Sequence, residues 1–171
     1  MKEKTKKNVY TAFIGEAKAH FRLLAYAERA EEEEAPQIAL LFRAIAEAER
    51  VHAMSHMNLA KDLIVKDTDT NLEKSFQREK SISENEYPDF IKDAEEEGEK
   101  AAVTVFSYAR DAEGYHAKLY ERAIYHTIKD KMATYHICQV CGYVTDKKLP
   151  DKCPVCGAPP EKFKTMSGES G

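Results

Sequence analysis

Two glutamate–histidine pairs with identical spacing are the residues of this chain best suited to chemistry. Glu49 is followed three residues later by His52, and Glu113 is followed in the same way by His116. Because residues i and i+3 lie on one face of a helix, each pair can direct a carboxylate and an imidazole into one cavity. The surrounding sequence repeats at the same shift of 64 positions, pairing Glu33 with Glu97, Phe42 with Phe106, Ala48 with Ala112, and Ala53 with Ala117. Two facing copies of such a pair can hold two metal ions side by side.

A single glutamate precedes each pair on the preceding amphipathic stretch. Glu16 lies 33 residues before Glu49, and Glu79 lies 34 residues before Glu113. All of these residues occupy the three- and four-residue spacing that elsewhere carries isoleucine, leucine and phenylalanine, so we expect them to face the core. An unpaired buried carboxylate costs on the order of several kcal/mol, which favours neutralisation or metal binding.

Four glutamates and two histidines, distributed in this way over four helices, are the ligand inventory of di-iron carboxylate bundles. Oxygen and nitrogen ligands of this kind suit iron or manganese, whereas zinc would bind without redox chemistry. A lone Glu-x-x-His is most simply interpreted as an ordinary surface pair. Two copies in equivalent inward positions, each preceded by an inward acid, favour a metal site. His20 and His56 also lie on inward stripes, and we interpret them as core or ligand-orienting residues.

All four cysteines form a second constellation near the C-terminus. Cys138 and Cys141 belong to one Cys-x-x-Cys-Gly sequence, and Cys153 and Cys156 belong to another. In each, the glycine permits a tight turn that points backbone amides at sulfur. Four thiolates at this spacing predict one tetrahedral site for either zinc or a single iron. The Cys-Pro-x-Cys-Gly form of the second sequence and the tyrosine after the first glycine favour iron.

Four amphipathic helices precede the cysteines and must position the acids and histidines. Pro36 fits the first turn of the second helix, since that position needs no amide donor. Pro88 should kink the third helix, and Gly98 should end it. The segment Asp67–Asn71 is polar and is expected to form a turn. The predicted helices cover approximately residues 5–32, 36–63, 72–97 and 102–124.

The residue pattern of the sequence changes near Thr134, where short apolar runs begin to alternate with glycine and proline. This pattern predicts short strands and turns. The segment is too small to fold without a stabilising disulfide or bound metal. The predicted organisation is therefore a helical domain over residues 1–133 and a small β-rich metal-binding domain over residues 134–171.

Composition excludes several classes of function. The chain has 171 residues, a third of them charged, and a net charge of −4, so the basic footprint of a nucleic-acid-binding protein is missing. No signal peptide and no membrane-spanning run is predicted, and we expect a cytoplasmic protein. Cysteines clustered in such a protein indicate metal binding in preference to disulfides.

The whole chain, from Asn8 to Phe163, resembles rubrerythrin. The motifs that carry the resemblance are Gly15-Glu16, Glu49-Arg-Val-His52, Glu79 ahead of Glu86-Tyr87-Pro88, Glu113-Gly-Tyr-His116, and the two cysteine sequences. The resemblance implies an all-α four-helix ferritin-like bundle followed by a rubredoxin-like Fe(Cys)4 domain. It also implies two irons in the bundle and one in the cysteine site of each subunit, with zinc as a possible substitute in either.

The resemblance further implies a peroxide reductase that protects against oxidative stress. Family members form homodimers in which electrons pass from the rubredoxin-like domain of one subunit to the di-iron site of the other. Hydrogen peroxide is the expected substrate. The expected electron source is a reductase or rubredoxin that draws indirectly on NAD(P)H. Tyr87 matches a family tyrosine that bonds to a ligand carboxylate, and we include it among the catalytic residues.

Two positions depart from the family pattern. Ile82 stands where the family usually has a glutamate that one iron exchanges for the histidine at the His52 position when its redox state changes. Leu23 stands where the family usually has a second tyrosine near the ligands. The first departure predicts that His52 is bound in both redox states and that the usual redox-linked iron movement is lost.

Three functions are compatible with these residues. Two ferrous ions side by side can deliver two electrons together to an O–O bond, and a tethered one-electron Fe(Cys)4 centre suits their rereduction. This favours a peroxide reductase, in which Glu49 and Glu113 bridge the irons. A ferritin-type ferroxidase or an oxidase that uses dioxygen is the alternative, and Ile82 keeps the oxidase open. A structural zinc site on an interaction module is the third.

Overall fold

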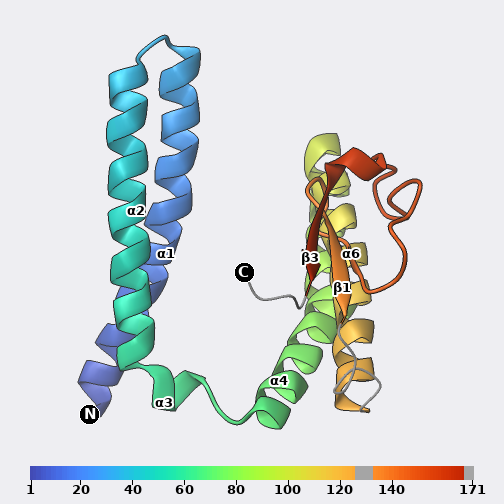
Figure 1. The fold of residues 1–171 in the computed structure, drawn as a ribbon, viewed down its shortest axis with the longest axis horizontal. Coiled ribbons are helices and arrows are strands. Elements are labelled where there is room, and N and C mark those ends of the chain that lie inside the picture. The colour runs from blue at the N-terminus through green and yellow to red at the C-terminus, as the bar shows by residue number, and fades with distance from the viewer. Residues whose placement is uncertain (126–132, 168–171) are drawn as a thin grey trace. The chain divides into compact units, whose positions relative to one another are not determined.

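The computed structural model describes residues 1–125 and 133–167, which are shown as ribbons in Figure 1. The chain divides into two compact units, Met1–Lys66 and Asp67–Gly171. The boundary predicted between residues 133 and 134 follows the stretch 126–132, which lies outside the described residues, and that boundary stays a prediction. The predicted fold class, helices followed by a small β-rich domain that carries the cysteines, is confirmed.

The first unit is a helical hairpin. Helix α1 (Glu3–Glu32) lies against helix α2 (Pro36–Leu59), and a short helix α3 (Lys61–Ile64) follows. The two long helices meet at buried alanines, Ala27, Ala30 and Ala39. These small side chains allow the two helix backbones to approach closely. Pro36 lies in the first turn of α2, as predicted. The predicted second helix ran to Leu63, whereas the structure ends it at Leu59 and adds the separate turn α3.

Within this hairpin the large apolar stripe of α2 is not buried. Leu41 is 54% exposed and Ile45 is 43% exposed, although the sequence places both on the same face as Glu49. The helices pack through the neighbouring alanine face instead, where Ala46 and Ala53 are buried. The expectation that this stripe is buried is therefore wrong for the unit taken by itself. Large exposed apolar faces of this kind are typical of surfaces that another element covers.

The helices of the second unit begin earlier than predicted. Helix α4 covers Thr68–Ser81, and the side chain of Asp67 accepts a 2.9 Å hydrogen bond from the backbone amide of Thr70. An aspartate at this position satisfies one of the free amides of the first turn. The expected turn over Asp67–Asn71 is therefore wrong from Thr68 onward, because its polar residues cap and begin a helix.

The predicted kink near Pro88 takes a defined form. Helix α4 is followed directly by a π-helical turn η1 (Ile82–Glu86) and then by helix α5 (Tyr87–Glu96). Proline lacks an amide and crowds the preceding turn, so the chain widens just ahead of it. Gly98 adopts a φ of 77° beyond the end of α5, which confirms it as the residue that stops the helix. Helix α6 (Lys100–Ile124) then packs against both α4 and α5.

The C-terminal domain is a three-stranded antiparallel sheet in the order β2-β1-β3. Its strands are β1 (Thr134–Cys138), β2 (Val144–Thr145) and β3 (Phe163–Ser167), with a 3-10 turn η2 (Pro160–Lys162) before β3. The register pairs Ile137 with Val144 on one side and with Lys164 on the other. The core of this domain is built around the cysteines themselves, with Tyr143, Ala158 and Phe163 packed against them.

The small domain contacts helix α6 within the second unit. The rings of Tyr115 and Tyr143 pack edge to face with their centroids 4.7 Å apart. Arg122 donates a 2.8 Å hydrogen bond to the carboxylate of Asp146. These contacts hold the turn that follows Cys141 against the helix that carries Glu113 and His116. Among the helices of the described residues, none has the length and apolar character needed to cross a membrane.

Candidate metal centres

The first unit gathers three of the six predicted bundle ligands. Glu16 from α1 and Glu49 and His52 from α2 offer ligand atoms that all lie within 4.8 Å of one another. The Nδ1 atom of His52 lies 3.0 Å from Oε2 of Glu49. The histidine side chain is 58% exposed in this unit, so the group opens on the uncovered face of the hairpin. We call these three residues the first triad.

The second unit gathers the other three ligands in the same pattern. Glu79 from α4 and Glu113 and His116 from α6 again have ligand atoms within 4.8 Å of one another. The Nδ1 atom of His116 lies 2.9 Å from Oε2 of Glu113, which repeats the pairing in the first triad. The side chain of His116 is only 22% exposed, so this second triad is the more enclosed one.

Two carboxylates, those of Glu79 and Glu113, meet in the second triad. Burial, a hydrogen bond to Glu113 and the negative charge of Glu113 raise the pKa of Glu79 to about 8. Like charges so close cannot both ionise easily, and a proton or a metal ion must separate them. The chemistry of this donor set therefore fits a cation such as iron, which would replace the proton.

The raised pKa of Glu79 predicts how the stability of the metal-free protein depends on pH. Its pKa in the folded state lies above the ordinary value of 4.5, so its contribution is fully present below about pH 4.5 and is lost as the pH rises toward 8. We expect the melting temperature of the metal-free protein to fall between pH 5 and pH 8, and Glu79→Gln to flatten this fall. Thermal melts of both proteins across this range check it, and identical pH profiles would contradict it.

A contact from the small domain assigns one ring nitrogen of His116 as a hydrogen-bond donor. Its Nε2 atom lies 2.9 Å from the carbonyl oxygen of Gly142, the residue after Cys141. A carbonyl only accepts, so Nε2 donates this hydrogen bond, and Nδ1, the atom that faces Glu113, is the ring nitrogen left to bind a metal ion. Histidine ligands of metals commonly donate their other ring nitrogen to a carbonyl in this way. Sequence spacing could not reveal this contact, because the partner lies 26 residues away in another domain.

Tyr87 lies close to the second triad. Burial, followed by the negative charges of Glu113 and Glu79, raises the pKa of the Tyr87 phenol. Its ring packs against those of Phe90 and Phe106 at centroid distances of 5.8 and 6.2 Å. The phenol therefore stays protonated beside the carboxylates. This placement supports its predicted role near the ligands.

Glu86 does not join the triad. Arg78 donates to both of its carboxylate oxygens, one of them at 3.1 Å, and Glu86 does not belong to the cluster of predicted ligands. Ile82, which stands where the rubrerythrin pattern usually has a glutamate, opens the π-helical turn one helical turn after Glu79. In the first unit, His20 directs Nδ1 to the carbonyl oxygen of Ala46 at 2.7 Å, in agreement with a core role.

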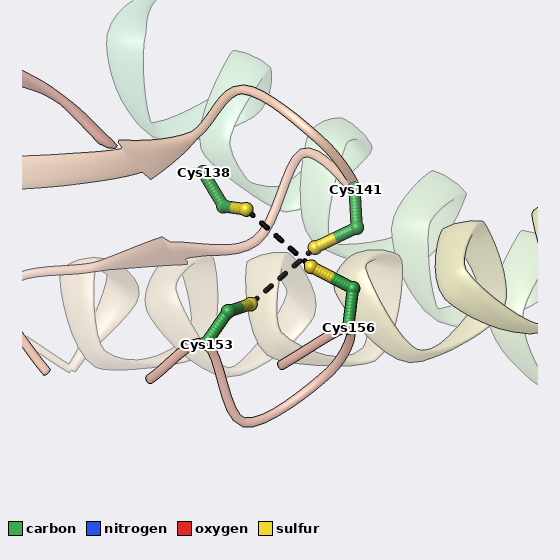
Figure 2. Close-up of side chains that lie close together, drawn as sticks. All are labelled: Cys138, Cys141, Cys153 and Cys156. Atoms are coloured by element: carbon green, nitrogen blue, oxygen red, sulfur yellow. Dashed lines mark hydrogen bonds between the residues drawn. The ribbon is translucent and has the colours of Figure 1, made fainter. Parts of the chain in front are cut away.

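The four cysteines converge on one point, as Figure 2 shows. Cys138 and Cys156 have their sulfurs 3.6 Å apart, and Cys141 and Cys153 have theirs 3.5 Å apart. Four sulfurs about 2.3 Å from a central ion form a tetrahedron with edges of about 3.8 Å, close to these separations. All four thiols are free of disulfides. The predicted four-cysteine cluster is therefore confirmed as an arrangement of side chains.

The backbone around the sulfurs follows the predicted geometry. Gly142 and Gly157 adopt φ values of 79° and 75°, and their amides return to the carbonyls of Cys138 and Cys153 at 3.0 and 2.9 Å. Burial opposes ionisation of Cys138, but hydrogen bonds from the amides of Val140 and Cys141 outweigh it and lower the pKa of this thiol. Burial raises the pKa of Cys141 and of Cys156. Bound metal would therefore displace protons from a site whose amides already point at sulfur.

Comparison with known proteins covers both regions. Residues 7–124 match the family model described as Rubrerythrin, and residues 136–164 match the one described as the rubrerythrin, rubredoxin-like domain. Rubrerythrin-2 of Clostridium acetobutylicum is 32% identical, over 91% of this chain and 93% of its own length. Nigerythrin of Nitratidesulfovibrio vulgaris is 34% identical, over 93% of this chain and 85% of its own length.

Solved structures of nigerythrin resemble the chain as well. The mixed-valence form and the fully reduced, all-ferrous form each match with a TM-score of 0.57 and 32% sequence identity. Each match covers 95% of this chain and 86% of the nigerythrin chain.

Proposed function

Because the chain belongs to the rubrerythrin family, we propose that it is a non-haem di-iron peroxide reductase that receives its electrons through an Fe(Cys)4 centre. Membership makes it a ferritin-like and rubredoxin-like iron-binding oxidoreductase. The proposal adds the substrate, hydrogen peroxide, and the source of electrons, a reductase or rubredoxin that is itself reduced from NAD(P)H. Each peroxide would take up two electrons and two protons and give two water molecules.

The observation that carries the proposal is the match between the two triads. Each consists of one glutamate from one helix and a Glu-x-x-His pair from the next, with the same Nδ1-to-carboxylate contact. Together the two triads make up the ligand set of di-iron bundles, one glutamate from each of two helices and a Glu-x-x-His pair from each of the other two. Glu49 and Glu113 would be shared by the two irons, Glu16 and His52 would hold one of them, and Glu79 and His116 would hold the other. When bound, the pair of ferrous ions supplies the two electrons that peroxide needs.

The residues around the second triad would control protons and water. The phenol of Tyr87 keeps its proton because burial and the nearby carboxylates raise its pKa, so it can donate a hydrogen bond toward Glu79 or Glu113. The rings of Phe90 and Phe106 pack against the ring of Tyr87 and against each other. The hydrogen bond from His116 to the carbonyl of Gly142 leaves Nδ1, the nitrogen that faces Glu113, as the atom that would bind the metal.

The same hydrogen bond supports an electron relay within one chain, whereas the resemblance leads us to expect a relay between subunits. Gly142 follows Cys141 directly, so one glycine residue and one hydrogen bond separate a cysteine of the predicted Fe(Cys)4 site from an imidazole of the second triad. A four-thiolate iron site changes little in geometry between oxidation states, which suits one-electron transfer. A storage function would not need such a connection. This favours a reductase over a ferritin-type ferroxidase.

Anaerobic stopped-flow spectroscopy tests the proposed substrate. The fully reduced protein is mixed in separate experiments with hydrogen peroxide and with dissolved dioxygen, and the return of the red ferric-thiolate absorbance is followed. The proposal expects fast reoxidation by peroxide and at least about 10-fold slower reoxidation by dioxygen, a difference of about 1.4 kcal/mol in barrier height. Faster reoxidation by dioxygen would instead establish the oxidase.

Ile82 leads to a separate prediction about metal movement. An isoleucine cannot exchange with His52 as a ligand, so both irons should keep their positions when the redox state changes. In crystal structures of the oxidised and reduced forms, each iron should occupy the same position to within about 1 Å, which is half a metal–oxygen bond length. An iron that leaves His52 on reduction would contradict the prediction. Ile82→Glu is the comparison variant, and we expect it to gain the movement.

A further inference from the structure

We propose that two copies of the chain exchange helical units, so that Met1–Lys66 of one copy completes the metal centre on Asp67–Gly171 of the other. The inference rests on the proposed function, because it assumes that the two triads hold one pair of irons. It goes beyond that function by assigning half of each centre to a second copy of the chain.

The first step is the distance that a ferritin-like connection must cover. From Glu49 to the end of α2 at Leu59 the helix rises about 15 Å, and from the start of α4 at Thr68 to Glu79 it rises about 16 Å. Ferritin-like folds have one long crossover between their helical pairs. This crossover runs along the bundle axis. If both triads lie at the same height along that axis, the crossover must span the two rises together, about 31 Å. It must also pass between helices whose axes are about 8–10 Å apart.

The second step is the length of the connection in this chain. Only residues 60–67 separate α2 from α4, and Lys61–Ile64 among them form α3. An extended residue spans at most about 3.3–3.6 Å and a helical one about 1.5 Å, so the connection reaches about 25 Å at most. It therefore falls short of the crossover. A second copy meets no such limit, because its own triad is not tied to this connection.

Both ends of the connection are fixed by local contacts. The amide of Ala60 donates to the carbonyl of His56 at 3.0 Å, which closes the last turn of α2. Asp67 caps α4 through the amide and hydroxyl of Thr70 at 2.9 and 2.7 Å. Unwinding the helix ends to lengthen the connection would break these bonds. The chain therefore favours exchange over a stretched crossover.

The exposed face of the first unit agrees with this arrangement. Leu41, Ile45 and Leu59 are each more than 40% exposed and share a stripe with the first triad. The second unit of another copy carries the three ligands that the first triad lacks. Covering the stripe with that unit buries the apolar residues and completes the ligand set in one step. Exchange of identical elements between copies is a low-cost route to a dimer.

A comparison of two heterodimers tests the exchange, with two differently tagged chains co-expressed and purified through both tags. The first heterodimer joins a Glu49→Gln chain to a Glu113→Gln chain. The second joins an unchanged chain to a chain with both substitutions. Both contain the same two changes per dimer, so differences in stability between them are minimised. The measurements are binuclear iron per dimer and peroxide reduction, with the unchanged homodimer as reference.

Exchange predicts one intact centre, and about half of the reference iron and activity, in the first heterodimer and none in the second. The opposite result, with the intact centre in the second heterodimer, would mean that each chain builds its own site and would overturn the inference. Purification of the unchanged protein as a monomer with full binuclear iron would overturn it as well. An unchanged homodimer without any binuclear iron would refute the proposed function instead.

Discussion

Replacing either Glu49 or Glu113 by glutamine is expected to remove the binuclear iron while the Fe(Cys)4 site stays filled. Each carboxylate contacts the histidine of its own triad at 2.9–3.0 Å and is assigned as a bridge between the irons. Glutamine keeps the size of the side chain but loses the charge that balances the metal. Changes to residues that merely orient a ligand already cost about 10–100-fold, so we expect peroxide reduction to fall by more than about 100-fold.

Iron analysis and peroxide assays of the purified variants check this expectation. Glu47→Gln is the matched control for the Glu49 variant, because Glu47 lies on the same helix, α2. It forms a surface ion pair with Arg50 at 2.7 Å and belongs to neither triad. The control should retain full iron and activity. Unchanged binuclear iron in the Glu49 and Glu113 variants would show that the metal is held elsewhere.

Replacing Cys141 by alanine is expected to remove the red Fe(Cys)4 centre, because a four-thiolate site loses metal affinity when one thiolate is missing. Without this centre to supply electrons, steady-state peroxide turnover should fall by more than about 10-fold. The four sulfurs also form the core of the small domain, so the sheet should loosen. The substitution leaves unchanged all six residues predicted to hold the binuclear centre. A single turnover of chemically reduced protein with peroxide should therefore remain close to that of the unchanged chain.

The contrast between steady-state and single-turnover rates separates electron supply from peroxide chemistry. Val140→Ala is the control, since Val140 lies between two of the cysteines and its side chain is 55% exposed. Far-UV circular dichroism of the Cys141 variant should retain the helical signal. An unchanged steady-state rate would mean that electrons reach the irons by another route.

Much of the candidate site could be predicted from the sequence, because ligands at i and i+3 report directly on a helix face. The repeat at a shift of 64 placed Glu49 with His52 and Glu113 with His116, and the structure brings each pair together with the expected acid, Glu16 or Glu79. The cysteine sequences were equally informative, since the spacing and the following glycine dictate the turn. That the two triads hold one pair of metal ions stays a prediction.

Other features depended on tertiary packing that no local pattern reveals. The periodicity of α2 marks its apolar stripe but does not show that α1 packs on the adjacent alanines and leaves Ile45 exposed. The helix start at Thr68 was missed because a polar run that begins with aspartate can either cap a helix or form a turn. The hydrogen bond between His116 and Gly142 joins residues of two domains. Neither the Glu-x-x-His motif nor the Cys-x-x-Cys-Gly motif could therefore indicate it.

The most direct measurement is iron counting combined with Mössbauer spectroscopy on protein loaded with iron under strictly anaerobic conditions. The account predicts two kinds of iron in a ratio of two to one, a binuclear pair held by the two triads and a single four-thiolate iron. After oxidation, the pair should show the magnetic coupling of bridged ferric ions. Protein that binds only the four-thiolate iron, with both triads empty, would contradict the account.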